Sequence, residues 1–311
     1  MAKGGVIDRE EIYKEIADEL EISLGDATVN RFSDGEIGVE IDESVRGDHV
    51  FVIQPTCPPV NENLMELMFI LDALKRSNVN SVTVVLPYYG YARQDRKSEP
   101  RVPISAKVVS DMLQMMNINR VITVDLHAGQ IQGFYDIPVD NLYASKVLIE
   151  PMANEGNKDE LCVVSPDVGG MERSNYYSRK LETSLAICYK HRENPNEISE
   201  MDVLGNVDGK KCIIVDDIVD TCGTLCKASD LLLKKGAKDV IAYVTHGVFS
   251  GDALDKLNNS SISKIVTTDT IPPSEEVMKN QKFEIVTVSD LLAETIFNTY
   301  YKKSVSKLFV S

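Results

Sequence analysis

The chain has 311 residues and a formal net charge of −15 at pH 7, which argues against nucleic acid or an anionic membrane as a partner, since both need a broad basic surface. Its apolar content of 43% and charged content of 26% are those of a soluble globular protein. No apolar run approaches the roughly 20 residues that span a bilayer, and the N-terminal sequence lacks a secretion signal. We therefore expect a cytoplasmic protein of two domains, with its six cysteines as buried or half-buried thiols in a reducing compartment.

Short β-rich runs alternate with helical patterns along the chain. In chain order we predict strands at residues 49–54, 81–87, 119–126, 161–166, 183–190, 210–217 and 238–247, and helices at 61–77, 103–116, 169–181 and 223–237. Continuous apolar strands that alternate with helices indicate parallel sheets covered by helices on both faces. The fold class is therefore α/β.

The two halves of the chain resemble each other, because a strand that opens into a polar loop occurs in both. We expect two tandem domains, at residues 1–145 and 146–290, each built on a mainly parallel sheet. Residues 291–311 are expected to form a C-terminal helix and tail that pack back on the first domain. The polar segment 190–206 has little hydrophobic periodicity, so we expect a mobile loop there.

Unusual polar clusters follow four of the predicted strands, at residues 87–101, 125–127, 165–170 and 216–224. In parallel sheets ligands bind beyond the carboxyl ends of the strands, so this coincidence predicts a ligand site. The cluster at 87–101 concentrates Arg93, Arg96, Lys97 and Arg101 in an acidic protein. Such a concentration suits an anionic substrate, although a solvated charge run would look the same.

The segment CIIVDDIVDTCGTLCK, residues 212–227, carries the most specific chemistry. A buried strand runs into Asp216 and Asp217, and Asp220-Thr-Cys-Gly-Thr224 then leads into a helix. Backbone amides at a helix N-terminus bind phosphate, and carboxylates accept hydrogen bonds from sugar hydroxyls. The segment therefore predicts a site for a pentose 5-phosphate. The alternative is an acidic turn that only caps the helix.

Several further segments make the chain similar to the ribose-phosphate pyrophosphokinase family of the first class, which has two phosphoribosyltransferase-type domains. They are RFSDGEIGVEIDESVRG (31–47), residues 59–76, LPYYGYARQDRK (86–97), PISAK (103–107), residues 124–144, VVSPDVGG (163–170) and THGVFSG (245–251). The resemblance implies transfer of the β,γ-pyrophosphoryl group of ATP to the anomeric hydroxyl of ribose 5-phosphate, with release of AMP, for nucleotide biosynthesis. It also implies a requirement for Mg²⁺, for which Mn²⁺ substitutes, and a cytoplasmic homohexamer.

The resemblance also places roles on particular residues. ATP contacts fall on Asp34, Gly35, Glu36, Arg93 and Gln94. Ribose 5-phosphate contacts fall on the segment already described, at Asp216, Asp217, Asp220, Thr221, Cys222, Gly223 and Thr224, with Arg192 added. Lys190 and Arg192 are the expected catalytic cations. Metal positions fall on His127 and Asp167, and more weakly on Asp125, Asp136 and Asp140. Arg46 and the C-terminal SVSKLF match regulatory contact segments.

Two other interpretations stay open. A type I phosphoribosyltransferase would have the same sugar-phosphate pattern at residues 216–224, but it would not need the nucleotide site at the SDGE and ARQDR segments. A catalytically silent regulatory subunit would be expected to lose the loop cations, whereas Lys190 and Arg192 are both present. The chain departs from the family at its N-terminus, which provides little of the usual first strand and Ser-Gly-Asn turn. Cys222 stands where a small residue is usual, so we expect sensitivity to thiol reagents.

Overall fold

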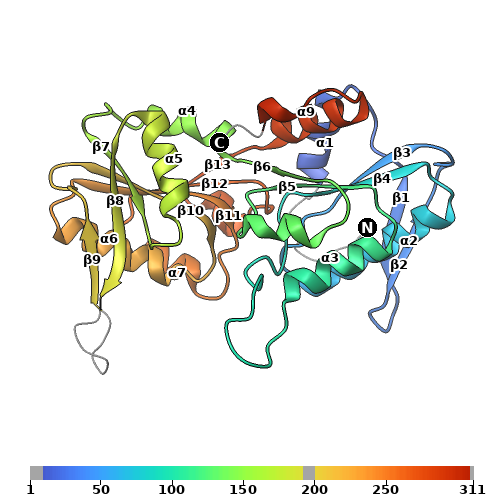
Figure 1. Ribbon diagram of the computed structural model, residues 1–311, viewed down its shortest axis with the longest axis horizontal. Helices are drawn as coiled ribbons and strands as arrows, with labels where there is room; N and C mark the ends of the chain where they lie inside the picture. The colour runs from blue at the N-terminus through green and yellow to red at the C-terminus, as the bar shows by residue number, and fades with distance from the viewer. Residues whose placement is uncertain (1–9, 192–199, 309–311) are drawn as a thin grey trace. The chain divides into compact units, whose positions relative to one another are not determined.

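The computed structural model describes residues 10–191 and 200–308 (Figure 1), which belong to two units. Unit 1 comprises Met1–Tyr143, Thr270–Pro272 and Ser289–Val310, and unit 2 comprises Ala144–Asp269, Pro273–Val288 and Ser311. The first boundary falls beside the predicted one at residue 145, and the C-terminal helix belongs to unit 1. No helix in the described part of the chain is long and apolar enough to cross a membrane.

Unit 1 is built on a four-stranded parallel sheet in the order β3-β4-β5-β6. Its elements are α1 (Glu10–Glu19), β1 (Ala27–Arg31), β2 (Ile37–Ile41), β3 (His49–Ile53), α2 (Val60–Arg76), β4 (Ser81–Leu86), α3 (Ser105–Met115), β5 (Arg120–Val124), the 3-10 helix η1 (Gly129–Phe134), β6 (Val139–Leu142), α9 (Ser289–Tyr300) and the 3-10 helix η2 (Ser306–Leu308). The apolar stripes of α2 and α3 pack on the sheet around Leu67, Leu71 and Leu113, which are buried. This packing makes the carboxyl ends of the four strands one rigid edge.

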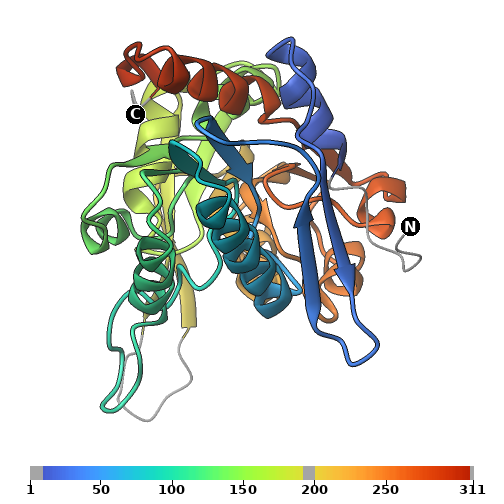
Figure 2. The same ribbon diagram turned by 90° about the vertical axis from the view of Figure 1, so that its right-hand side faces the viewer.

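Two parts of unit 1 lie outside this sheet. β1 and β2 form an antiparallel hairpin whose second strand packs against α2, and Figure 2 shows it as a pair of blue strands standing apart from the sheet. At the other extreme of the sequence, α9 packs against α1, as Figure 1 shows. The tail helix thus contacts the first helix of the same unit.

Unit 2 is built on a seven-stranded sheet in the order β13-β12-β11-β10-β7-β8-β9, which is parallel except for β9. Its elements are α4 (Ser145–Ala153), β7 (Leu161–Ser165), α5 (Met171–Leu181), β8 (Ser184–His191), β9 (Glu200–Leu204), β10 (Lys211–Val219), α6 (Gly223–Lys234), β11 (Asp239–Gly247), α7 (Ala253–Asn258), β12 (Lys264–Thr268), α8 (Glu275–Lys279) and β13 (Phe283–Val286). Helices α4 and α5 cover one face of the sheet, and α6 and α7 cover the other (Figure 1).

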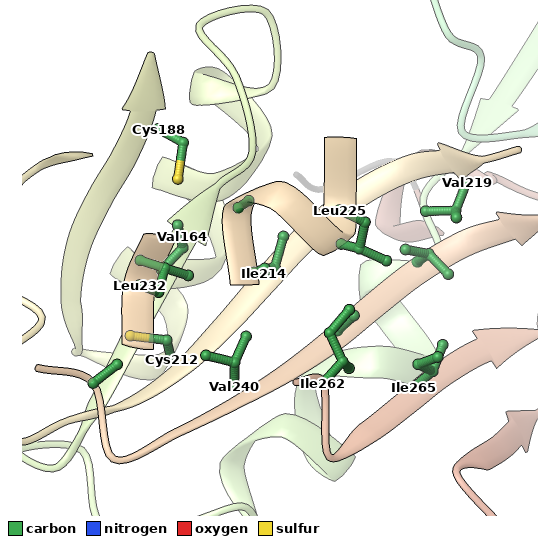
Figure 3. Close-up of a cluster of buried hydrophobic side chains, with 14 of the residues drawn as sticks. Val164, Cys188, Cys212, Ile214, Val219, Leu225, Leu232, Val240, Ile262 and Ile265 are labelled. Atoms are coloured by element: carbon green, nitrogen blue, oxygen red, sulfur yellow. The ribbon is translucent and has the colours of Figure 1, made fainter. Parts of the chain in front are cut away.

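The core beneath α6 consists of side chains that alternate along the strands. Cys212 and Ile214 of β10 lie beside Val164 of β7, and Leu225 and Leu232 of α6 close over them (Figure 3). All five are at most 4% exposed. Successive side chains of a strand point to opposite faces of the sheet, and helices bury both faces here, so the strands are apolar on both faces.

The predicted α/β class and its two tandem, mainly parallel sheets are confirmed. Every strand and helix predicted in chain order is present, with ends shifted by a few residues. The prediction of a mobile loop over 190–206 is wrong for residues 200–204, which form β9 and pair antiparallel with β8. Backbone hydrogen bonds to β8 stabilise this strand, and they cannot be predicted from its polar sequence. Residues 192–199 lie outside the described part of the chain.

Candidate functional site

The sheet of unit 2 has a topological switch point between β7 and β10. From β7 the chain adds β8 on one side, and it then returns to place β10 on the other side. Ligands in open α/β sheets bind beyond the carboxyl ends of the strands where the order reverses. The loops that follow β7 and β10 begin with Pro166-Asp167 and Asp220 respectively. Two of the predicted clusters are therefore brought to one edge.

The loop after β10 is fixed at both ends by buried side chains. Val219 before it and Leu225 after it are each 4% exposed and contribute to the same core (Figure 3). Between them, Cys222 adopts a left-handed φ of 63° and serves as the N-cap residue of α6, which begins at Gly223. Thr221 and Thr224 are exposed. A turn of this kind, leading straight into a helix N-terminus, presents backbone amides suited to a phosphate.

Cys222 itself is buried. Burial raises the pKa of its thiol to about 12, so the thiol is protonated at neutral pH. Because the thiolate is the reactive form, this environment argues against the sensitivity to thiol reagents expected from the sequence. All six cysteines are free, and five of them are buried.

The two aspartates near the carboxyl end of β10 have different surroundings. Asp217 is 4% exposed, and its Oδ1 lies 2.9 Å from Nη1 of Arg173 on α5. Asp216 is half-buried and lies 3.8 Å from the same nitrogen. Burial, followed by the neighbouring Asp217 charge, raises the pKa of Asp216 above its ordinary value. A perturbed carboxyl at a strand end marks a candidate site.

Sequence reasoning did not single out Arg173. Its signal was available, because an aspartate inside an apolar strand needs a cation nearby, and Arg173 lies in the helix that follows the Gly169-Gly170 turn. The structure thus gives Asp217 a protein partner, and its sugar contact stays a prediction. Asp216, with more of its surface open, is the better placed of the two for a ligand hydroxyl.

Asp167 lies at the carboxyl end of β7 in a turn that its own atoms help to hold. Its Oδ1 accepts a hydrogen bond from the Gly170 amide at 2.9 Å, and its backbone oxygen accepts one from the Ser165 hydroxyl at 2.6 Å. The residue is exposed. An exposed carboxylate held in a fixed turn is a suitable ligand for a hard cation.

The predicted catalytic cations begin at the end of β8. The backbone of Lys190 pairs with Met201 of β9, so the base of the following segment is anchored in the sheet. Arg192 lies outside the described residues. The roles of both cations stay predictions.

In unit 1 the basic loop after β4 is held at several points. The hydroxyl oxygen of Thr56 accepts a hydrogen bond from the backbone amide of Gly90 in this loop at 2.7 Å. A Cβ at Gly90 would lie 2.4 Å from the Thr56 carbonyl oxygen, so only glycine fits. Further along, Gln94 accepts a hydrogen bond from the Ser105 hydroxyl at 2.5 Å. Arg93 is exposed on this braced loop.

The basic loop is also joined to the segment that contains His127. Asp95 accepts a hydrogen bond from the side-chain amide of Gln130 at 2.6 Å. His127 is exposed at the carboxyl end of β5, and Asp125, two residues earlier, is buried with a left-handed φ of 41°. The structure therefore brings together two of the predicted clusters in unit 1, as it does in unit 2.

The predicted ATP contacts at 34–36 form the turn of the β1–β2 hairpin. Asp34 accepts a hydrogen bond from the Glu36 amide at 3.1 Å, and Gly35 adopts a φ of 93°. Gly35 also lines a pocket of about 440 Å³, together with Arg31, Ile37, Asn61, Glu62 and Met65. The hydroxyl of Tyr91, from the basic loop, donates to Asn61 on this pocket's wall. The hairpin turn and the basic loop thus both reach the α2 side of the pocket.

Three of the remaining predicted residues lie elsewhere in unit 1. Asp140 is buried near the amino end of β6 and forms an ion pair with Arg120. Asp136 precedes β6, and its amide donates to Gln114 at 2.6 Å. Neither lies at the strand edge that carries His127, so their expected link to a metal finds no support in their positions. Arg46 is exposed between β2 and β3.

The donor set can be tested against Mg²⁺. In the described residues, no three His, Cys, Asp or Glu side chains gather into a group that could hold a metal ion. Mg²⁺ is usually bound by one or two carboxylates together with substrate phosphates and water, rather than by an all-protein cage. An exposed carboxylate such as Asp167 fits that mode of binding.

Two α/β units, one with a phosphate-type loop at its switch point, define a protein of the phosphoribosyltransferase structural class. The sequence matches the N-terminal domain of ribose phosphate pyrophosphokinase over residues 6–116 and the phosphoribosyl synthetase-associated domain over 167–310. It is 51% identical over 296 residues to the ribose-phosphate pyrophosphokinase of Wolinella succinogenes, covering 95% of this chain and 94% of that one. Identity to the same-named protein of Xanthomonas axonopodis pv. citri is 52% over 301 residues, covering 96% and 94%.

A solved structure agrees with these relatives. The crystal structure of phosphoribosylpyrophosphate synthetase from Mycobacterium smegmatis superposes with a TM-score of 0.89 at 38% sequence identity, covering 94% of this chain and 96% of that one. The chain belongs to the ribose-phosphate pyrophosphokinase family, which is a family of enzymes.

Proposed function

We propose that the protein transfers the β,γ-pyrophosphoryl group of ATP to the anomeric hydroxyl of ribose 5-phosphate, giving 5-phosphoribosyl 1-pyrophosphate and AMP. The observation that carries the proposal is the loop after β10. Its helix N-terminus at Gly223 and its carboxylate at Asp220 lie beside the carboxylate of Asp216, near the end of β10, at the switch point of unit 2. A ligand that has a phosphate at one end and hydroxyls beside it matches that arrangement.

In this proposal the residues of unit 2 hold the sugar phosphate. The amides of residues 221–224 bind the 5-phosphate, while Asp216 and Asp220 accept hydrogen bonds from ribose hydroxyls. Fixing the sugar in this way converts attack by the anomeric oxygen into an effectively intramolecular step. The anomeric oxygen forms a bond to the β-phosphorus as the bond from that phosphorus to the AMP oxygen breaks.

The nucleotide is assigned to residues of unit 1. Arg93 supplies positive charge, Gln94 supplies an amide, and Gly35 of the 34–36 turn lines a pocket large enough for part of a nucleotide. Lys190 and Arg192 neutralise the charge that develops on the leaving AMP oxygen. Mg²⁺ would neutralise the triphosphate and polarise its phosphoryl oxygens; Asp167 is the proposed ligand in unit 2, and His127 is a separate candidate ligand in unit 1.

The test is to follow the β-phosphate. ATP labelled at the β position, incubated with Mg²⁺ and ribose 5-phosphate, should transfer its label to the sugar product, with one AMP released per label transferred. ADP as the coupled product would indicate an ordinary kinase. Consumption of phosphoribosyl pyrophosphate with a nucleobase, and no reaction with ATP, would identify a type I phosphoribosyltransferase. A regulatory subunit would show neither reaction alone.

We also propose that the protein works as a homo-oligomer, with a hexamer as the expected size. The hairpin of unit 1 supports this, because Val29 and Phe32 are 39% and 58% exposed there, and exposed apolar surface favours an interface. Light scattering after size-exclusion chromatography measures the mass. A monomer at working concentration would contradict the proposal.

A further inference from the structure

A segment of unit 2 that is not part of the phosphate loop contacts that loop at several points. Residues 247–256 run from the last residue of β11 into α7. The amides of Val248 and Phe249 both donate to the carbonyl oxygen of Val219, at 2.9 and 3.3 Å. The hydroxyl of Ser250 donates to Oδ1 of Asp220. From α7, the ammonium of Lys256 lies 3.4 Å from the carbonyl oxygen of Thr221. We name residues 247–256 the bracing segment.

The bracing segment is held in a conformation that only its surroundings explain. Phe249 has a φ of 47°, in the left-handed region that costs energy for a residue with a side chain. Its ring packs edge-on against Phe283 of β13, with centroids 5.1 Å apart and planes at 84°. A Cβ at Gly247 would lie 2.2 Å from the Phe249 ring, so glycine makes this packing possible. The strained residue Phe249 therefore directly precedes Ser250, whose hydroxyl contacts Asp220.

The contact between Ser250 and Asp220 has a chemical use. A carboxylate on a loop turns readily about its last side-chain bond, because that torsion is broad. It has about four acceptor positions on its two oxygens. A hydroxyl that donates to one oxygen is a charge-assisted hydrogen bond, and it fixes the direction in which the other positions point. It does so without adding a charge next to the phosphate.

We propose that Ser250 is a positioning residue for the sugar phosphate. It holds the Asp220 carboxylate in the orientation that meets a ribose hydroxyl, and it leaves the nucleotide untouched. The proposal rests on the function proposed above, since it takes ribose 5-phosphate as the ligand of the loop.

The experiment compares Ser250→Ala with the wild type in the full-length protein. Loss of a hydrogen bond to a charged group corresponds here to a rise of about 5- to 30-fold in KM for ribose 5-phosphate. KM for ATP should stay within about twofold, because the bond lies in the sugar-phosphate loop. Ser250→Thr keeps the hydroxyl and should recover most of the affinity. A KM for ribose 5-phosphate at the wild-type value in Ser250→Ala would overturn the proposal.

A matched control is available in the same unit. The hydroxyl of Ser261 donates to Asp230 at 2.9 Å on the exposed surface, so Ser261→Ala removes the same kind of bond away from the loop. Both KM values should stay at wild-type levels in this variant. If Ser261→Ala raised KM for ribose 5-phosphate as much as Ser250→Ala does, the effect would be general and the proposal would fail.

A double variant shows whether Ser250 acts through Asp220. In an Asp220→Asn background, Ser250→Ala should add less than about twofold to KM. Multiplicative effects of the two changes would refute the positioning role. Calorimetric binding of ribose 5-phosphate separates this proposal from the function proposed above. Wild type that binds the sugar but makes no AMP contradicts the reaction alone, and the Ser250→Ala binding ratio then decides the positioning role. Wild type that binds no ribose 5-phosphate overturns both.

Discussion

The guanidinium of Arg173 lies 2.9 Å from Asp217 and 3.8 Å from Asp216, so one cation on α5 faces two consecutive carboxyls near the carboxyl end of β10. Asp217 takes the closer contact and is the more buried of the two. One positive charge does not neutralise two negative ones. Burial raises the pKa of Asp216, the neighbouring Asp217 charge raises it further, and the Arg173 cation lowers it by less.

We expect Arg173→Met to destabilise the protein. The change leaves Asp217 buried without this cation, and breaking a buried pair in this way costs about 3–5 kcal/mol. Urea denaturation at pH 7 measures the free energy of unfolding. The control is Lys158→Met, which removes the exposed ion pair with Glu182 and should leave that free energy nearly unchanged. Equal stability of the Arg173 variant and the wild type would contradict the assignment.

We expect Asp216→Asn to make the folded protein more stable and the enzyme worse. The folded-state pKa of Asp216 is raised, so folding favours its protonated form. The stability that this carboxyl contributes is present below the ordinary aspartate pKa of about 4 and is lost as pH rises towards the folded-state value. The variant should therefore gain about 1 kcal/mol or more over the wild type at pH 8, and little at pH 4.

Denaturation curves at the two pH values check the stability of Asp216→Asn. The same variant should raise KM for ribose 5-phosphate above the folded-state pKa of about 8, where the wild-type carboxyl is ionised and only accepts while an amide both donates and accepts. ATP binding should change little. A stability difference that does not vary with pH would show that the pKa of Asp216 is not raised in the folded protein. Equal rises in KM for both substrates would indicate a misfolded loop.

We expect Lys190→Ala to lower kcat by about 10²–10³-fold, with much smaller changes in KM. A cation placed where charge develops stabilises the transition state more than the ground state, and loss of one preorganised donor costs about this much. Steady-state kinetics with each substrate varied in turn gives both constants. Lys210, whose ammonium donates to Ser184 at 2.8 Å, provides a control lysine away from the strand end. Near-normal kcat in Lys190→Ala would contradict a catalytic role for Lys190 and would mean that the segment after β8 only covers the site.

We expect a chelator to abolish turnover, and Mg²⁺ or Mn²⁺ to restore it, because the triphosphate reacts as its metal complex. Activity measured in excess EDTA, and then after titration with each ion, gives the result. Asp167→Asn should shift the Mg²⁺ requirement to higher concentration, whereas Asp136→Asn should not, since Asp136 lies away from the strand edge. Full activity in excess chelator would reject the metal requirement.

Local pattern was enough to predict most of the fold, since strands such as 81–86 and helices such as 60–76 have strong hydrophobic periodicity. It was not enough for β9, because residues 200–204 are stabilised by pairing with β8 and not by their own apolar content. The hairpin of β1 and β2 was not predicted for the same reason, since all of β1 is exposed. Strands that depend on a partner leave little trace in their own residues.

For the candidate site, the sequence by itself determined the loop chemistry: Asp216, Asp220 and the helix start at Gly223 are adjacent in the chain, and short-range geometry decides what adjacent residues present to a ligand. Only the tertiary structure decided which carboxyl is neutralised and which is held in place. Arg173 is 44 residues from Asp217, and Ser250 is 30 residues from Asp220. Contacts at that separation exist because β7, β10 and β11 lie side by side in the sheet, and strand order is fixed by the packing of the whole core rather than by any one segment.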